Sequence, residues 1–149
     1  MTKHQHLTIV GWREWLSLPE LNIPHLKAKL DTGARTSALH AFHVDPFERD
    51  GKLWVRFGIH PIQGNTDQFI ECEAPVIDQR DVSDSGGHTE KRYVIEVLIT
   101  MGNFSWRAEC TLTNRDSMKF RMLLGRTAIS EQFLVNSAAS YLVGKKPVK

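Results

Sequence analysis

Short apolar runs separated by turn residues make up the hydrophobic pattern of this chain. In residues 26–30 the three apolar positions share one face of an extended segment, while Lys27 and Lys29 share the other. This period-two alternation predicts a half-buried strand that ends at Asp31. The two lysines are interpreted as the solvated face of that strand.

Similar apolar runs predict further strands along the chain. Their spans are 8–11, 38–44, 53–59, 68–72, 93–101 and 105–113, with 133–135 and 141–143 as candidate terminal strands. Gly102-Asn103 is expected to form a hairpin turn, and residues 127–132 a short helix capped by Thr127. Six or more short strands with one short C-terminal helix predict a mainly β fold, a closed barrel or a sandwich.

Composition indicates the size class of the protein and argues against some classes of partner. The chain has 149 residues, of which 41% are hydrophobic and 24% charged, and this fits one globular domain over residues 1–149 without disulfides. The net charge of +2 is small, and no basic cluster alternates with aromatics, so we expect no nucleic-acid partner. Cys72 and Cys110 have no C-x-x-C partner and are expected to be buried free thiols.

The N-terminal residues carry no targeting signal that we recognise. Residues 1–6 are polar and precede an apolar run of only four residues. That pattern fits neither a secretory signal nor a membrane span. A cytoplasmic protein without membrane contact is the resulting expectation.

Asp31-Thr32-Gly33 is the stretch most suggestive of chemistry. A carboxylate at the end of an apolar strand can hold and activate water, the hydroxyl of Thr32 can brace the loop, and Gly33 lets backbone approach a second carboxylate. The same three residues also suit an ordinary strand-to-turn exit. The string alone leaves both interpretations open.

A second motif lies about ninety residues downstream, where the apolar run of residues 122–124 meets Gly125-Arg126. With both motifs the chain resembles the retropepsin-like aspartic peptidases over most of residues 24–135. That resemblance implies a closed retropepsin-like β-barrel in which Leu124, Gly125 and Arg126 support the Asp31 loop. Residues 31–41 resemble more closely a bacterial family often labelled "ATP-dependent zinc protease". Some of its members occur beside or fused to ATP-grasp ligases that add glutamates to a ribosomal protein, so the resemblance implies a peptidase acting on acidic tails.

A single Asp31 does not make a catalytic pair. Asp84-Ser85-Gly86 could in principle supply the second carboxylate, but no apolar strand precedes it, and 149 residues are too few for two complete lobes. We therefore expect a homodimer in which two Asp31 carboxylates share one proton across a two-fold axis.

Residues 78–92 are predicted to form a mobile hairpin with Ser85, Gly86 and Gly87 at its tip. In retropepsin-like enzymes such a hairpin is the flap that covers the substrate and excludes water. The alternative is a plain solvated loop. Together with Ala34 and Arg35, the three tip residues are the expected substrate-binding group.

Arg35 stands where retroviral-type loops carry an acidic residue that pairs with the arginine of the Gly-Arg motif. It cannot pair with Arg126, for which Asp116 and Glu131 are the candidate partners. A guanidinium at the cleft rim favours carboxylates, so we expect an acidic peptide or protein substrate.

A metal-dependent peptidase is the first rival to this interpretation. The chain has no H-E-x-x-H, and His40 and His43 would point to opposite faces of a regular strand, although a bulge could realign them. No glycine-rich loop with Lys-Ser or Lys-Thr indicates ATP binding. We expect no metal and no cofactor. The second rival is a β-barrel interaction module without catalysis.

Overall fold

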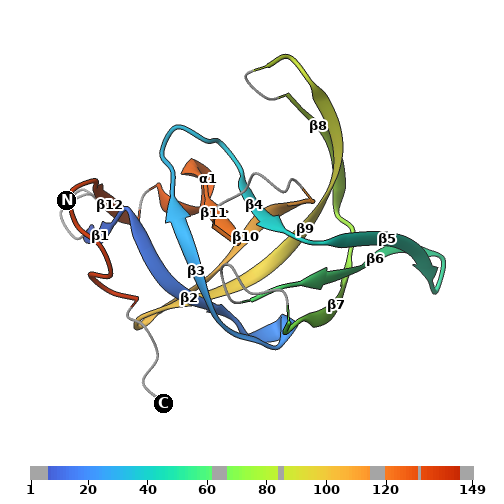
Figure 1. Ribbon diagram of the computed structural model, residues 1–149, viewed down its shortest axis with the longest axis horizontal. Helices are drawn as coiled ribbons and strands as arrows, with labels where there is room; N and C mark the ends of the chain where they lie inside the picture. Colours follow the sequence, from blue (N-terminus) through green and yellow to red (C-terminus); the bar gives the residue numbers. More distant parts are fainter. Residues whose placement is uncertain (1–6, 62–66, 84–85, 115–119, 131, 145–149) are drawn as a thin grey trace.

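The computed structural model describes residues 7–61, 67–83, 86–114, 120–130 and 132–144 (Figure 1). Within them the protein is mainly β, with one short α-helix and one 3-10 turn. The elements are β1 Thr8–Gly11, β2 Arg13–Leu18, η2 Pro19–Leu21, β3 Ile23–Leu30, β4 Ser37–His40, β5 His43–Arg49, β6 Lys52–Ile59, β7 Ile70–Pro75, β8 Asp78–Ser83, β9 Thr89–Met101, β10 Phe104–Thr113, β11 Met122–Leu124, α1 Arg126–Ile129 and β12 Phe133–Asn136. The mainly β prediction with one short C-terminal helix is therefore confirmed.

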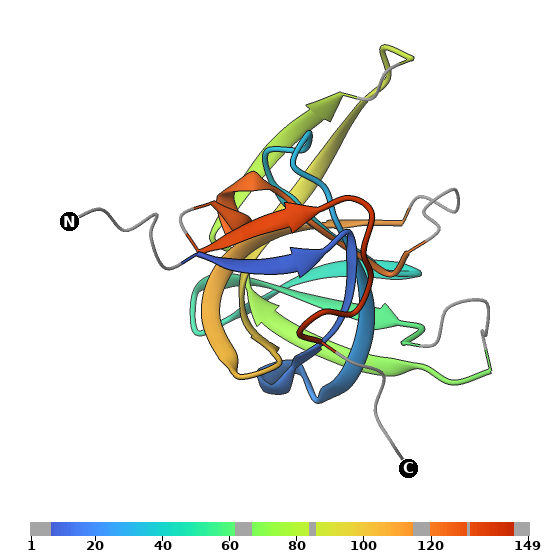
Figure 2. The same ribbon diagram turned by 90° about the vertical axis from the view of Figure 1, so that its left-hand side faces the viewer.

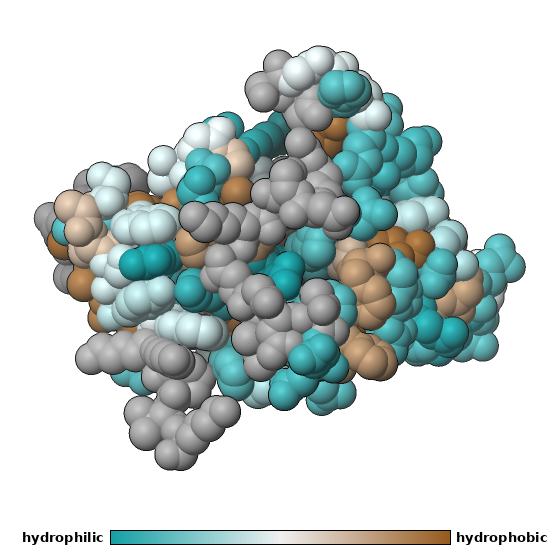
Figure 3. All heavy atoms as spheres, in the orientation of Figure 1, coloured by the Kyte–Doolittle hydropathy of each residue, from teal (hydrophilic) through white to brown (hydrophobic). Residues whose placement is uncertain are grey.

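Six strands form a ring in the order β10-β4-β11-β3-β2-β9, which closes through pairing between β9 and β10. Strand β8 extends this sheet beyond β9, and the β8–β9 hairpin projects from the body as an arm (Figures 1 and 2). Strands β5, β6 and β7 form a separate antiparallel sheet, and β1 pairs with β12 in parallel. Hydrophilic residues cover much of the arm, and hydrophobic residues gather between it and the β5–β6 hairpin (Figure 3).

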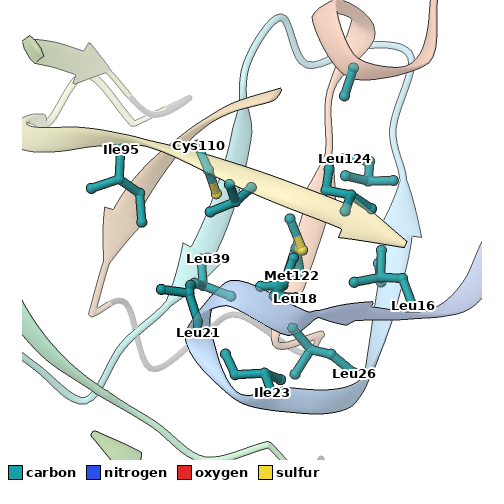
Figure 4. Close-up of a cluster of buried hydrophobic side chains, with 14 of the residues drawn as sticks. Leu16, Leu18, Leu21, Ile23, Leu26, Leu39, Ile95, Cys110, Met122 and Leu124 are labelled. Carbon is teal, nitrogen blue, oxygen red and sulfur yellow. The ribbon is translucent and has the colours of Figure 1, made fainter. Parts of the chain in front are cut away.

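The core fills the space inside the ring. Alternate positions of β3 and β11 point inward, and Leu26, Met122 and Leu124 are completely buried there (Figure 4). Burial of each such side chain contributes on the order of 1.5–3 kcal/mol. This packing fixes the register of β3. It therefore also fixes which side chains of β3 face away from the core.

Most of the predicted strands are present, and two predictions are wrong. The span 38–44 breaks into β4 and β5, because Ala41 N–H bonds to β10 at Thr113 and Phe42 N–H to β6 at Gly58, so the chain changes sheets there. Residues 141–143 are not a strand, since Tyr141 has a φ of 56° and the next two amides bond to the side chain of Glu14.

The predictions for turns and for the start of the helix were only partly correct. Gly102 has a φ of 60° in the turn between β9 and β10, as expected. Helix α1 begins at Arg126, with Gly125 as its N-cap and no side-chain cap, so the prediction of Thr127 as the cap is wrong. Strand β2 was not predicted, and β8 was predicted only as one arm of the hairpin over residues 78–92.

Both cysteines are buried and free, as predicted. Burial raises the pKa of Cys72 and of Cys110 to about 12, so both thiols stay protonated and unreactive at neutral pH. Among the described residues, no helix has the length and apolar character needed to cross a membrane.

Candidate active site

Two segments far apart in sequence meet at Asp31. Strand β3 runs parallel to β11 with Leu30 opposite Leu124, and the N–H of Asp31 donates to Leu124 O at 2.8 Å. The chain therefore leaves β3 beside Gly125-Arg126. The structure brings together the two motifs that the sequence singled out.

The loop after β3 is folded around the Asp31 side chain. Asp31 Oδ1 accepts a hydrogen bond from Gly33 N–H at 2.9 Å, and Ala34 N–H donates to Asp31 O at 3.2 Å. Asp31 is half-buried, whereas Thr32 and Gly33 are exposed. One carboxylate oxygen is thus oriented by backbone while the loop tip stays open to solvent.

Gly125 lies directly against this loop. A Cβ atom at Gly125 would come within 2.7 Å of Thr36 C and 2.9 Å of Ala34 O, so only glycine fits. Ser37 Oγ accepts a hydrogen bond from Gly125 N–H at 3.1 Å. Nothing in the sequence marked Ser37 as part of this site, because only the pairing of β4 with β11 brings it to Gly125.

The start of α1 continues the contact with the loop. Arg126 N–H donates to Ala34 O at 2.7 Å, and Thr127 N–H to Arg35 O at 3.1 Å. Arg126 Nη1 donates to Thr32 O at 3.3 Å and to Gly33 O at 3.2 Å. The guanidinium thus holds the Asp31 loop through its carbonyls, and the candidate partners Asp116 and Glu131 lie outside the described residues.

Arg35 is exposed beside the loop, and in the part of the chain that the structure describes its side chain makes no ion pair or hydrogen bond. It is an accessible cation close in sequence to Asp31. An acidic ligand that binds Arg35 would therefore not have to displace a carboxylate of the described residues.

The hairpin predicted over residues 78–92 is present as β8 and β9, with Ser83 opposite Thr89. Gly87 has a φ of 84°, which favours glycine. Ser85 lies outside the described residues, whereas Gly86 and Gly87 lie near the tip. In both Figures 1 and 2 the arm and the loop between β3 and β4 lie toward the same end of the molecule.

His40 and His43 lie on either side of the sheet change. His40 ends β4 and is buried, and His43 begins β5 with Nε2 at 2.6 Å from Glu71 and Nδ1 at 3.1 Å from Asp45. The hydrogen bonds to Glu71 and then Asp45 raise the pKa of His43. No group of three or more histidine, cysteine, aspartate or glutamate side chains suited to a metal occurs among the described residues.

Comparison with solved structures supports this arrangement of strands. A crystal structure of the protein Lpg0085 of unknown function from Legionella pneumophila matches with a TM-score of 0.76 and 28% sequence identity. The match covers 91% of this chain and 98% of that chain.

Relatives by sequence are longer proteins. A "Probable alpha-L-glutamate ligase" of Shewanella pealeana is 48% identical over 138 residues, which is 93% of this chain and 30% of the relative. One of the same name from Desulfotalea psychrophila is 42% identical over 137 residues, again 30% of the relative. The chain thus spans about a third of the length of these relatives. A family model described as "RimB-like: Retropepsin-like aspartic endopeptidase RimB" matches residues 9–146, and the chain belongs to this retropepsin-like family.

Proposed function

We propose that this protein is an aspartic endopeptidase in which the Asp31 carboxylates of two copies activate a water molecule. The observation that carries the proposal is the Asp31 loop, with its carboxylate oriented by Gly33 and its backbone held by Arg126. In the described residues no second carboxylate bonds to Asp31, so a second copy of the chain is the source we propose for it. An isologous two-fold contact would bring two identical loops together.

The chemistry follows from two like charges at short range. Two carboxylates about 3 Å apart cannot both ionise, so the pair holds one proton. The ionised Asp31 takes a proton from water as the water attacks the peptide carbonyl, and the protonated Asp31 donates its proton to the carbonyl oxygen. Thr32 and Gly33 keep the two loops close, and the β8–β9 arm serves as the flap that excludes bulk water.

Acidic peptides are the proposed substrates. Relatives carrying a matching segment are named probable glutamate ligases. A peptidase that works together with a glutamate ligase would act on Glu-rich chains. Arg35 is exposed and has no carboxylate partner within the described residues. Two copies in a dimer would place one such cation on each side of the scissile bond.

The central test is the pair Asp31→Asn and Asp50→Asn, the latter at an exposed turn between β5 and β6. Cleavage of a Glu-rich peptide should be abolished in Asp31→Asn and unchanged in Asp50→Asn, with equal thermal unfolding midpoints. Full cleavage by Asp31→Asn would refute the aspartic mechanism. Absence of cleavage by the unmodified protein as well would favour the interaction module.

Chelators separate the proposal from the metal-dependent rival. Activity should survive strong chelators and be lost to a peptide mimic that carries a tetrahedral hydroxyl, because a carboxylate pair binds that group without metal. Loss of activity in chelator and its return with zinc would establish the metal-dependent mechanism instead.

Arg35 tests the choice of substrate. Arg35→Ala should lower kcat/KM about tenfold to a hundredfold on Glu-rich peptides and much less on neutral ones, because a charge-assisted bidentate contact contributes roughly 1.5–3 kcal/mol. Arg35→Lys should recover only part of that loss. Equal losses on both peptides would mean that Arg35 acts on the structure of the loop.

A further inference from the structure

Strands β2 and β3 lie side by side and share an outward face (Figure 1). Burial alternates along both strands, so every second side chain faces away from the core. In the antiparallel register Arg13 lies opposite Lys29, and Trp15 lies opposite Lys27. His25 is the next residue of β3 on the same side. We call these five residues the basic aromatic face.

Side chains of this face lie close to aromatic rings. Lys27 Nζ lies 5.7 Å from the centre of the Trp15 ring, and the rings of Trp15 and His25 meet edge to face with their centres 5.9 Å apart. The guanidinium of Arg13 lies over the ring of Trp12, 4.7 Å from its centre. Cations and rings are thus interleaved across the two strands.

No carboxylate of the described residues pairs with a cation of this face. Lys27 and Lys29 take part in none of the ion pairs there, and Arg13 Nε bonds instead to Ser140 Oγ at 3.1 Å. Glu14 is buried and accepts hydrogen bonds from backbone N–H groups. Like charges directly opposite each other, as Arg13 and Lys29 are, destabilise a pair of strands. An anion bound between them would replace that repulsion by attraction, so the face favours a negatively charged partner.

A pocket of about 210 Å³ adjoins the face at Trp15 and His25. Pro24 adds an apolar ring to its wall, and Ser17 and Thr100 add hydroxyl groups. A flat heteroaromatic ring suits such a wall, because it can contact the indole or the imidazole while its polar edge bonds to the hydroxyls. The pocket therefore favours a ligand that carries planar rings as well as negative charge.

This pocket is separate from the Asp31 loop. His25 precedes Asp31 by six positions, which correspond to about 20 Å along an extended strand. Gly102, in the turn between β9 and β10, lines the pocket, whereas the Asp31 loop contacts β11 and the start of α1. The basic aromatic face thus extends from the pocket toward the candidate active site without being part of it.

We propose that the basic aromatic face binds single-stranded nucleic acid. One unstacked base occupies the pocket beside Trp15 and His25, and the flanking phosphates bind Lys27 and Lys29. A Glu-rich peptide would satisfy the cations but would leave the rings and the pocket unused. The sequence led to the expectation of no nucleic-acid partner because cations and rings do not alternate along the chain, whereas here they are interleaved across two strands. This site is independent of the proposed peptidase function.

The experiment measures fluorescence polarisation of labelled probes with the full chain. The probes are single-stranded oligouridylate, the same RNA annealed to oligoadenylate, and hexaglutamate. The variants are Trp15→Leu, Trp15→Phe, Lys27→Gln and Lys29→Gln. Matched controls on β6, in the separate sheet, are Trp54→Leu for the loss of a ring and Lys52→Gln for the loss of a charge.

Affinity for oligouridylate should fall about tenfold in Trp15→Leu, because a ring that contacts a base is lost, and should recover in part in Trp15→Phe. Each lysine variant should bind about threefold more weakly and should lower the slope of log affinity against log salt by about 0.7, since one phosphate contact is lost. The duplex should bind more weakly than the single strand, because its bases are stacked on one another. Both controls should bind like the unmodified protein.

Several outcomes would overturn the proposal. They include equal RNA affinity in all variants and absence of RNA binding by the unmodified protein at low salt. Tighter binding of hexaglutamate than of RNA, reduced in the lysine variants but not in Trp15→Leu, would assign the face to acidic peptides instead. Weaker binding of every probe together with a lower unfolding midpoint would assign these residues a structural role. If Trp15→Leu does not fold, Trp15→Phe and the two lysine variants still decide the test.

Discussion

Glu14 offers the sharpest stability prediction, because its buried carboxylate is held entirely by backbone donors. It is 0% exposed, and Oε2 accepts hydrogen bonds from Gly11 N–H at 2.6 Å and Leu142 N–H at 2.9 Å. Oε1 accepts from Val143 N–H at 3.1 Å and Gly144 N–H at 2.7 Å. The side chain therefore fastens the C-terminal segment to β1 and β2.

The perturbation is Glu14→Gln, which keeps the shape and replaces one oxygen by an NH₂ donor. Two backbone N–H groups then face a donor instead of an acceptor. Each buried hydrogen bond left unmade costs about 1–3 kcal/mol, so two cost about 2–6 kcal/mol. For a chain of this size we expect the thermal midpoint to fall by roughly 10 °C.

The assay is thermal unfolding followed by circular dichroism, together with amide hydrogen exchange. The control is Glu48→Gln, whose exposed side chain on β5 makes no hydrogen bond in the described structure. Amides of residues 142–144 should lose protection in Glu14→Gln alone. A midpoint within about 2 °C of the control, with protection retained, would refute the role given to this carboxylate.

Three further outcomes can be measured on single variants. Gly125→Ala should lower the free energy of unfolding in urea by about 1–3 kcal/mol and abolish activity, because its Cβ would overlap the Thr36 backbone; wild-type activity would contradict this. Arg126→Gln should speed hydrogen exchange at Gly33 and Ala34 by releasing the loop carbonyls, and unchanged exchange would show that Arg126 does not hold the loop. The raised pKa of His43 implies stability that is fully present below its ordinary value of 6.5 and is lost as pH rises through the folded value. The stability difference between wild type and His43→Gln should therefore shrink toward high pH, and an NMR pKa for His43 at or below 6.5 would rule out this effect.

The sequence by itself determined the local elements and the position of Asp31. Period-two alternation in residues 26–30 marks the buried face of β3 and the end of the strand, because core packing leaves its pattern in consecutive side chains. Gly102-Asn103 likewise marks a turn through local backbone preference. The pairing of Asp31-Thr32-Gly33 with Gly125-Arg126 was expected from family resemblance, and the structure places these motifs in contact.

Only the tertiary structure decided which distant residues share a surface. The break between β4 and β5 occurs where Ala41 N–H bonds to β10 and the next amide, that of Phe42, bonds to β6, and no pattern within residues 38–44 records this change of partner. The burial of Glu14 depends on a segment about 130 residues away. Leu123 lies opposite Lys29 only because β11 runs parallel to β3 in one register. The local pattern indicates which face of a strand a side chain lies on. The residue opposite it in the sheet depends on how the whole ring packs, so these contacts could not be predicted from the sequence.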